Sequence, residues 1–121
     1  MKHFINLKDI PAKDLRKILL DAKKRKKNRK SYNTLKIDKD IPLKNKLLIQ
    51  MFEKSSLRTR LSFYLAIKQL GGGTITLRSN ELHLGDGGES IEDTAKILST
   101  YGDGFMIRTD SDKKIENFSN Y

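Results

Sequence analysis

Hydrophobic positions along the chain follow two alternating spacings, one typical of helices and the other typical of buried strands. Apolar stripes at helical spacing predict helices over residues 11–27 and 58–70, after Ser90 and from near Ser111. Short apolar or β-branched runs predict strands over residues 46–52, 73–77 and 104–107. A polar link, 28–45, joins the first helix to the first strand. This order of elements predicts an α/β fold, with a parallel sheet flanked by helices and right-handed crossovers.

The segment between the first predicted strand and the next helix is rich in hydroxyl groups and arginines. It reads Ser55-Ser56-Leu57-Arg58-Thr59-Arg60. A strand that leads directly into a helix points the first N–H groups of the helix beyond the strand's carboxyl end, where phosphate binds readily. Arginines there oppose the helix dipole by about 0.3–1 kcal/mol each, which a bound anion would offset. The pattern favours a phosphate or carboxylate site, and the alternative is a Ser N-cap followed by solvated arginines.

Arg108 closes the third predicted strand. Because parallel strands end at a common edge, the topology predicts that Arg108 lies near residues 56–59, where Arg58 adds a planar guanidinium that can bind two phosphate oxygens at once. The alternative is a local ion pair with Asp110 or Asp112.

The arginine-rich segment resembles the carbamoyl-phosphate signature of the aspartate/ornithine carbamoyltransferase family, usually written Ser-Thr-Arg-Thr-Arg. The resemblance extends to the first helix, the first strand, the segment 84–95 and the third strand, and so covers essentially the whole chain. Ornithine-specific members are the nearest match, because Phe52-Glu53-Lys54 precedes the signature and Met106-Ile107-Arg108-Thr109 ends the third strand.

The resemblance implies that residues 1–121 form a carbamoyl-phosphate-binding domain. The implied reaction transfers the carbamoyl group to the δ-amine of ornithine, giving citrulline and phosphate in arginine metabolism, without a protein nucleophile, cofactor or metal. Arg108 is the implied catalytic residue. The implied carbamoyl-phosphate-binding residues are Ser56, Leu57 through its N–H, Arg58, Thr59, His83 and Arg108.

Two of these positions depart from the family pattern. Leu57 replaces the first Thr of the signature and removes one hydroxyl donor. His83 stands where the family often has a Gln that reaches into a neighbouring subunit's site. The alternative for a lone His in a Gly-flanked polar loop is an exposed or hydrogen-bonded side chain.

Members of this family also have a second, ornithine-binding domain, whose motifs would lie beyond Tyr121. We therefore expect the chain to be a fragment, incomplete at the C-terminus and inactive alone, whose parent is a cytoplasmic homotrimer. The alternatives are an aspartate carbamoyltransferase-like enzyme and a free-standing phosphate-binding module.

Composition limits the other classes of function. The net charge is +10, and much of it lies in the basic block, residues 23–30. No aromatic residue interleaves with the block, so we expect a solvated helix end, with a nucleic-acid patch as the alternative. No apolar run reaches the roughly 18 residues of a membrane span, the N-terminus lacks a signal-peptide core, and the absence of cysteine fits a reducing compartment. We expect neither nucleic acid nor membrane as a partner.

Overall fold

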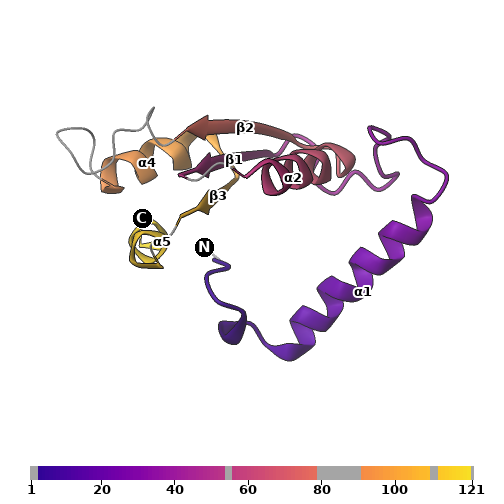
Figure 1. The fold of residues 1–121 in the computed structure, drawn as a ribbon, viewed down its shortest axis with the longest axis horizontal. Helices are drawn as coiled ribbons and strands as arrows, with labels where there is room; N and C mark the ends of the chain where they lie inside the picture. The colour runs from indigo at the N-terminus through magenta and orange to yellow at the C-terminus, as the bar shows by residue number, and fades with distance from the viewer. Residues whose placement is uncertain (1–2, 54–55, 79–90, 110–111, 121) are drawn as a thin grey trace.

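The computed structural model describes residues 3–53, 56–78, 91–109 and 112–120, and it confirms the predicted α/β fold (Figure 1). Helices flank a parallel sheet, as the spacing of apolar residues predicts. In chain order the elements are η1 (Leu7–Asp9), α1 (Ala12–Asn28), β1 (Leu47–Phe52), α2 (Leu57–Gln69), β2 (Gly73–Arg78), α4 (Ile91–Tyr101), β3 (Gly104–Arg108) and α5 (Asp112–Ser119).

In the described part of the chain, the sheet has three parallel strands in the order β2-β1-β3. Phe52, the last residue of the central strand β1, lies opposite Arg78 of β2 and opposite Arg108 of β3. The carboxyl ends of all three strands are therefore in register at one edge, called here the carboxyl edge. Glu53 and Thr109, which directly follow β1 and β3, therefore lie side by side at this edge.

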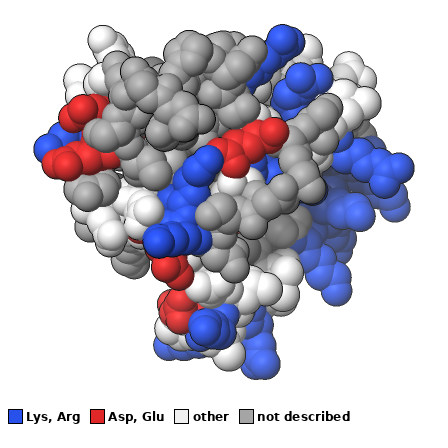
Figure 2. All heavy atoms as spheres, turned by 60° about the vertical axis from the view of Figure 1, so that its left-hand side comes forward, with Lys and Arg blue, Asp and Glu red and all other residues white. Residues whose placement is uncertain are grey.

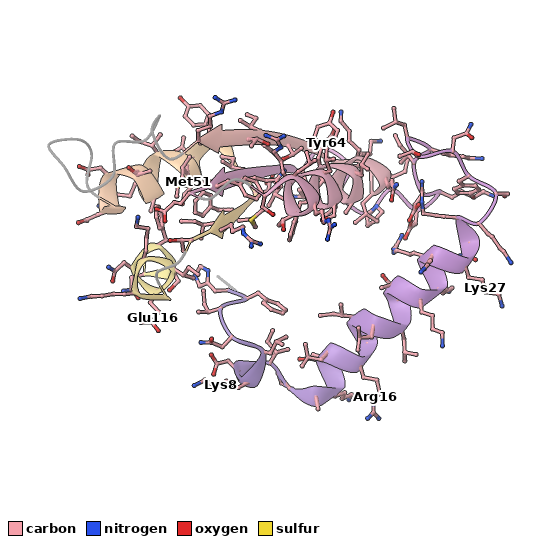
Figure 3. All side chains as sticks on the ribbon, in the orientation of Figure 1. Lys8, Arg16, Lys27, Met51, Tyr64 and Glu116 are labelled. Atoms are coloured by element: carbon pink, nitrogen blue, oxygen red, sulfur yellow. The ribbon has the colours of Figure 1, made fainter. Side chains whose placement is uncertain are left out.

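The core lies on one face of the sheet, around Met51 of β1. Met51 is fully buried and packs in one cluster with Ala95 of α4 and Phe118 of α5, with Phe105 of β3 against it (Figure 3). The rings of Phe105 and Phe118 lie 5.2 Å apart between centroids. Truncating a buried Met to Ala typically costs about 2–5 kcal/mol, so this cluster is what fixes α4 and α5 on the sheet.

Helix α1 stands away from the sheet (Figure 1). The predicted helix is confirmed, but none of its residues is buried, and Ile18 and Leu19 of its apolar stripe are 53% and 70% exposed. Arg16 and Lys27 also point away from the sheet (Figure 3). The position of α1 therefore depends on its carboxyl-terminal end.

That end is held by arginines of the basic block, which corrects part of the sequence prediction. Arg25 binds three carboxylates, Asp21 through Nε at 2.9 Å, Asp38 through Nη1 at 2.9 Å and Asp40 through Nη2 at 2.6 Å. Arg29 Nη1 lies 2.5 Å from the other oxygen of Asp38, whose side chain is only 9% exposed. The prediction of a solvated helix end is thus wrong for Arg25 and Arg29, because the link folds back and brings its carboxylates to them.

The link is in turn bonded to the end of α2. Asp38 N donates to Gln69 O at 2.7 Å, and Leu43 N donates to Leu70 O at 2.9 Å. The chain turns there through Gly71 at φ 94°, and a Cβ at Gly71 would lie 2.2 Å from Ile41 Cγ2. Glycine is required at this position both by the backbone conformation and by the contact with the link.

Candidate functional site

The amino end of α2 lies at the carboxyl edge and begins after Ser56. Ser56 is extended at φ −148°, the N-cap position, yet its side chain makes no capping hydrogen bond. Its hydroxyl donates instead to Thr59 Oγ1 at 2.9 Å. Ser56 thus occupies the N-cap position without its side-chain capping bond, and among the described residues the first amides of the helix, from Leu57 to Thr59, keep no intrahelical acceptor.

Arg108 reaches the same point from the end of β3. Its Nη1 donates to Thr59 Oγ1 at 3.1 Å, across a sequence separation of 49 residues. The Thr59 oxygen thus accepts from both Ser56 and Arg108, which leaves its own hydroxyl hydrogen available to a further acceptor. The predicted convergence of residues 56–59 and Arg108 is confirmed. The suggested ionic partners of Arg108, Asp110 and the Asp112 side chain, lie outside the described residues.

The signature arginines are exposed and carry unbalanced charge. Within the described part of the chain, Arg58 and Arg60 make no ion pair or side-chain hydrogen bond, and the first turn of α2 holds no acidic residue. Figure 2 turns the left-hand side of Figure 1 forward and shows both cationic and acidic side chains on this face. Unpaired N–H groups, unpaired guanidinium groups and a free hydroxyl proton at one edge are suited to bind an anion with several oxygens.

Glu53 follows β1 at the carboxyl edge and binds residues at the end of β3 and in α5. Its N–H donates to Arg108 O at 3.0 Å, and its carboxylate accepts hydrogen bonds from the Thr109 hydroxyl and from Lys114 Nζ of α5. The side chains of Glu53 and Lys114 are 20% and 27% exposed. Sequence reasoning gave these residues no role, although Glu53 and Thr109 stand in the two strings that carry the family resemblance. Their contacts span more than 50 residues, so local pattern could not reveal them.

His83 was also predicted to bind the anion. It lies outside the described residues, and its role stays a prediction. The described residues hold no group of three or more His, Cys, Asp and Glu side chains arranged for a metal ion. Among the described helices, none combines the length and apolar character that crossing a membrane requires.

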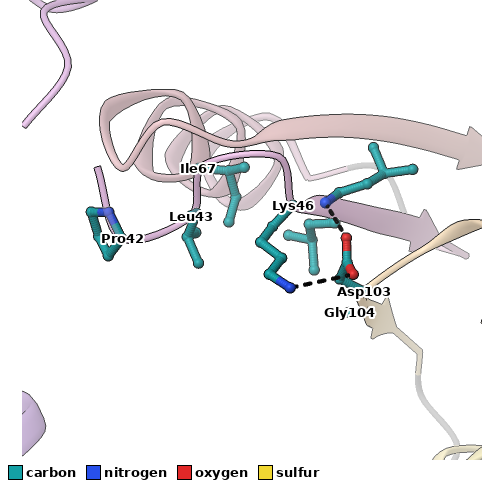
Figure 4. Close-up of a pocket in the computed structure, with 8 residues that line it drawn as sticks. Pro42, Leu43, Lys46, Ile67, Asp103 and Gly104 are labelled. Atoms are coloured by element: carbon teal, nitrogen blue, oxygen red, sulfur yellow. Dashed lines mark hydrogen bonds and ion pairs between the residues drawn. The ribbon is translucent and has the colours of Figure 1, made fainter. Parts of the chain in front are cut away.

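The opposite edge of the sheet has a different character. A pocket of about 370 Å³ lies there, at the amino ends of β1 and β3 (Figure 4). Asp103 accepts from Leu47 N at 2.8 Å and pairs with Lys46 at 3.9 Å, so the charged groups of this pocket bind each other. Its other lining residues are Pro42, Leu43, Leu47, Leu48, Ile67 and Gly104. An anion site therefore fits the carboxyl edge and not this pocket.

The fold and this edge define a class: a parallel α/β domain in which the helix after the central strand begins beside the end of a neighbouring strand. The family model "Aspartate/ornithine carbamoyltransferase, carbamoyl-P binding domain" matches residues 2–121. The chain belongs to that family.

Known relatives agree with this assignment. The chain is 44% identical over 118 residues to the ornithine carbamoyltransferase of Caulobacter vibrioides, covering 98% of this chain and 38% of the relative. It is 45% identical over 121 residues to that of Brucella ovis, covering 100% and 37%. The chain thus spans less than two fifths of the length of these relatives.

Solved structures share the fold. Ornithine carbamoyltransferase from Pyrococcus furiosus superposes with a TM-score of 0.88 at 35% identity, over 99% of this chain and 36% of that one. The catalytic subunit of M. jannaschii aspartate transcarbamoylase gives a TM-score of 0.82 at 36% identity, over 100% of this chain and 39% of that one. The fold alone is therefore common to ornithine- and aspartate-specific enzymes.

Proposed function

We propose that the chain binds carbamoyl phosphate at its carboxyl edge, as the carbamoyl-phosphate-binding domain of an ornithine carbamoyltransferase. The observation that carries this proposal is the junction of Ser56, Thr59 and Arg108 at the start of α2, in a chain that matches a carbamoyl-phosphate-binding family. Two elements distant in sequence supply donors to one point there. The identities to ornithine-specific relatives favour ornithine as the acceptor over aspartate.

The binding groups have separate roles. The amides of Leu57, Arg58 and Thr59 and the Thr59 hydroxyl hold phosphate oxygens, and the Ser56 hydroxyl joins them when it turns from Thr59 to the ligand. The guanidinium group of Arg58 neutralises the dianion. Arg108 binds the carbonyl oxygen together with a phosphate oxygen. When the δ-amine attacks the carbonyl carbon, negative charge grows on that oxygen, and a preorganised donor stabilises it by a few kcal/mol. His83 completes the proposed set.

The enzyme's wider context follows from the same proposal. Residues 1–121 form one carbamoyl-phosphate-binding domain, ornithine binds to groups outside it, and the whole protein is a cytoplasmic homotrimer that serves arginine biosynthesis. Support comes from the family resemblance and, for the compartment, from the lack of cysteine.

Calorimetric titration tests the binding step. Carbamoyl phosphate should bind the wild-type protein, and Arg108→Ala should weaken binding by about 10- to 150-fold, the equivalent of one charge-assisted contact. Arg16→Ala is a matched control, because Arg16 points away from the sheet on α1 (Figure 3). Equal affinities for Arg108→Ala and wild type would overturn the assignment of the site.

Citrulline formation tests the acceptor. The complete gene product should form citrulline from carbamoyl phosphate and ornithine, and the 121-residue chain alone should not. Formation of carbamoyl aspartate in place of citrulline would favour the aspartate-specific alternative. Binding of carbamoyl phosphate without transfer to either amine would favour a phosphate-binding module.

A further inference from the structure

Arg108 depends on a neighbour for its position, because it is an exposed arginine at the end of an edge strand. Among the described residues no strand pairs with the outer side of β3, and a long side chain at such an end loses rotamer freedom when it is ordered. An arginine that must meet an anion at a defined point therefore benefits from an anchor close to its own backbone.

Glu53 supplies such an anchor through two contacts, one to the Arg108 carbonyl group and one to Thr109. The Glu53 N–H donates to Arg108 O at 3.0 Å, and the Glu53 carboxylate accepts from the hydroxyl of Thr109, the next residue. One residue thus binds the Arg108 carbonyl group and the side chain of the residue that follows Arg108. Arg108 then reaches Thr59 Oγ1 at 3.1 Å.

Lys114 of α5 neutralises the negative charge that Glu53 brings to the carboxyl edge. A carboxylate beside an anion site repels the ligand, and the repulsion acts over about 8 Å at physiological salt. The ion pair from Lys114 Nζ of α5 balances that charge while it ties α5 to the end of β1. The side chains are 20% and 27% exposed, so the pair is only partly screened by water.

From these contacts we infer that Glu53, Thr109 and Lys114 form a positioning cluster for Arg108, through which α5 controls the affinity of the anion site. The inference rests on the proposed function, since it takes Arg108 as a ligand of carbamoyl phosphate. It adds residues whose role is to hold the Arg108 backbone and α5 in place at this edge. These residues are positioning residues.

A double-mutant cycle on the complete gene product tests the cluster. Calorimetry with inorganic phosphate and with carbamoyl phosphate should show affinity about 3- to 10-fold lower for Thr109→Val and for Lys114→Gln. In the Arg108→Ala background neither change should lower affinity further, because coupled residues are non-additive. A cluster that is merely structural would weaken binding equally in both backgrounds, which would overturn the inference.

Matched controls and a rescue complete the design. Thr100→Val removes a hydroxyl that bonds only Lys96 O in α4, and Lys113→Gln removes the exposed lysine next to Lys114, so both should bind like wild type. Lys114→Arg keeps the ion pair and should restore affinity even if Lys114→Gln folds poorly. Wild-type affinity in Thr109→Val would contradict the inference, whereas failure of the wild-type protein to bind either anion would contradict the proposed function instead.

Discussion

Two groups of arginines in this chain differ in whether their charge is paired with carboxylates of the chain. Arg25, on α1, binds three carboxylates, and these hydrogen bonds, led by the one to Asp40, raise its pKa further above the ordinary value. Arg58 and Arg60, in the first turn of α2, have no carboxylate partner among the described residues. The first group holds the chain together, and the second group is left with its charge available to a ligand.

The largest effect on stability is expected at Asp38, the carboxylate shared by Arg25 and Arg29. Asp38→Asn would leave two partly buried guanidinium groups without their common partner, so we expect the free energy of unfolding to fall by about 3 kcal/mol. Carbamoyl-phosphate affinity of the folded protein should not change. Urea denaturation and calorimetry measure the two quantities, with the exposed Asp9→Asn as control. A stability loss no larger than that of Asp9→Asn would show that the arginines of α1 are not structural.

Arg58 should behave in the opposite way. Arg58→Ala removes a charge-assisted contact and should weaken carbamoyl-phosphate binding by about 1.5–3 kcal/mol. Its unfolding free energy should stay equal or rise by about 0.3–1 kcal/mol, because a cation at a helix N-terminus opposes the dipole. Calorimetry and urea denaturation give both values. Unchanged affinity in this variant would remove Arg58 from the site.

The pH dependence of stability sharpens the comparison at Asp40. The hydrogen bond from Arg25 holds the pKa of Asp40 below its ordinary value in the folded protein. The stabilisation is therefore complete above the unfolded pKa of about 3.9 and is lost as pH falls through the lower folded value. Asp40→Asn should melt below wild type at neutral pH, and the gap should close on acidification. Melting curves recorded from neutral pH to pH values below 3.9 test this, and a gap that widens in acid would contradict it.

The smallest effect is expected from the lysines of the basic block. Replacing Lys23, Lys24, Lys26 and Lys27 by Gln spares Arg25 and Arg29 and should leave carbamoyl-phosphate affinity nearly unchanged, because exposed charges are screened beyond about 8 Å. Duplex DNA should bind weakly and lose affinity steeply with salt. Tight, sequence-dependent DNA binding in a gel shift at physiological salt, abolished by these four changes, would favour the nucleic-acid alternative.

Much of this architecture could be predicted because its signals are local. The bounds predicted for β1 from its apolar run, and for α2 from its apolar stripe, lie within one residue of the observed bounds. The parallel topology then predicted that Arg108 meets residues 56–59, and Thr59 confirms it. Predicted contacts to the anion itself stay predictions.

What the sequence did not reveal depends on long-range contacts. The basic block looked uniform, and its arginines differ from its lysines only because Asp38 and Asp40 fold back from the link, 13 and 15 residues beyond Arg25. Glu53 meets Lys114 across 61 residues. Such pairings follow from the folded path of the chain, which no spacing rule describes.

The parallel sheet, finally, makes the anion site a late product of folding. Thr59 and Arg108 are 49 residues apart, and they meet only after β3 has docked against β1. Closing a loop of that length is entropically costly, and non-local contacts of this kind slow folding. A ligand that binds across the junction therefore selects chains in which β3 is in place. Phosphate in the refolding buffer would then stabilise the docked β1–β3 pair by mass action, so that an anion of the proposed site would act as a folding ligand.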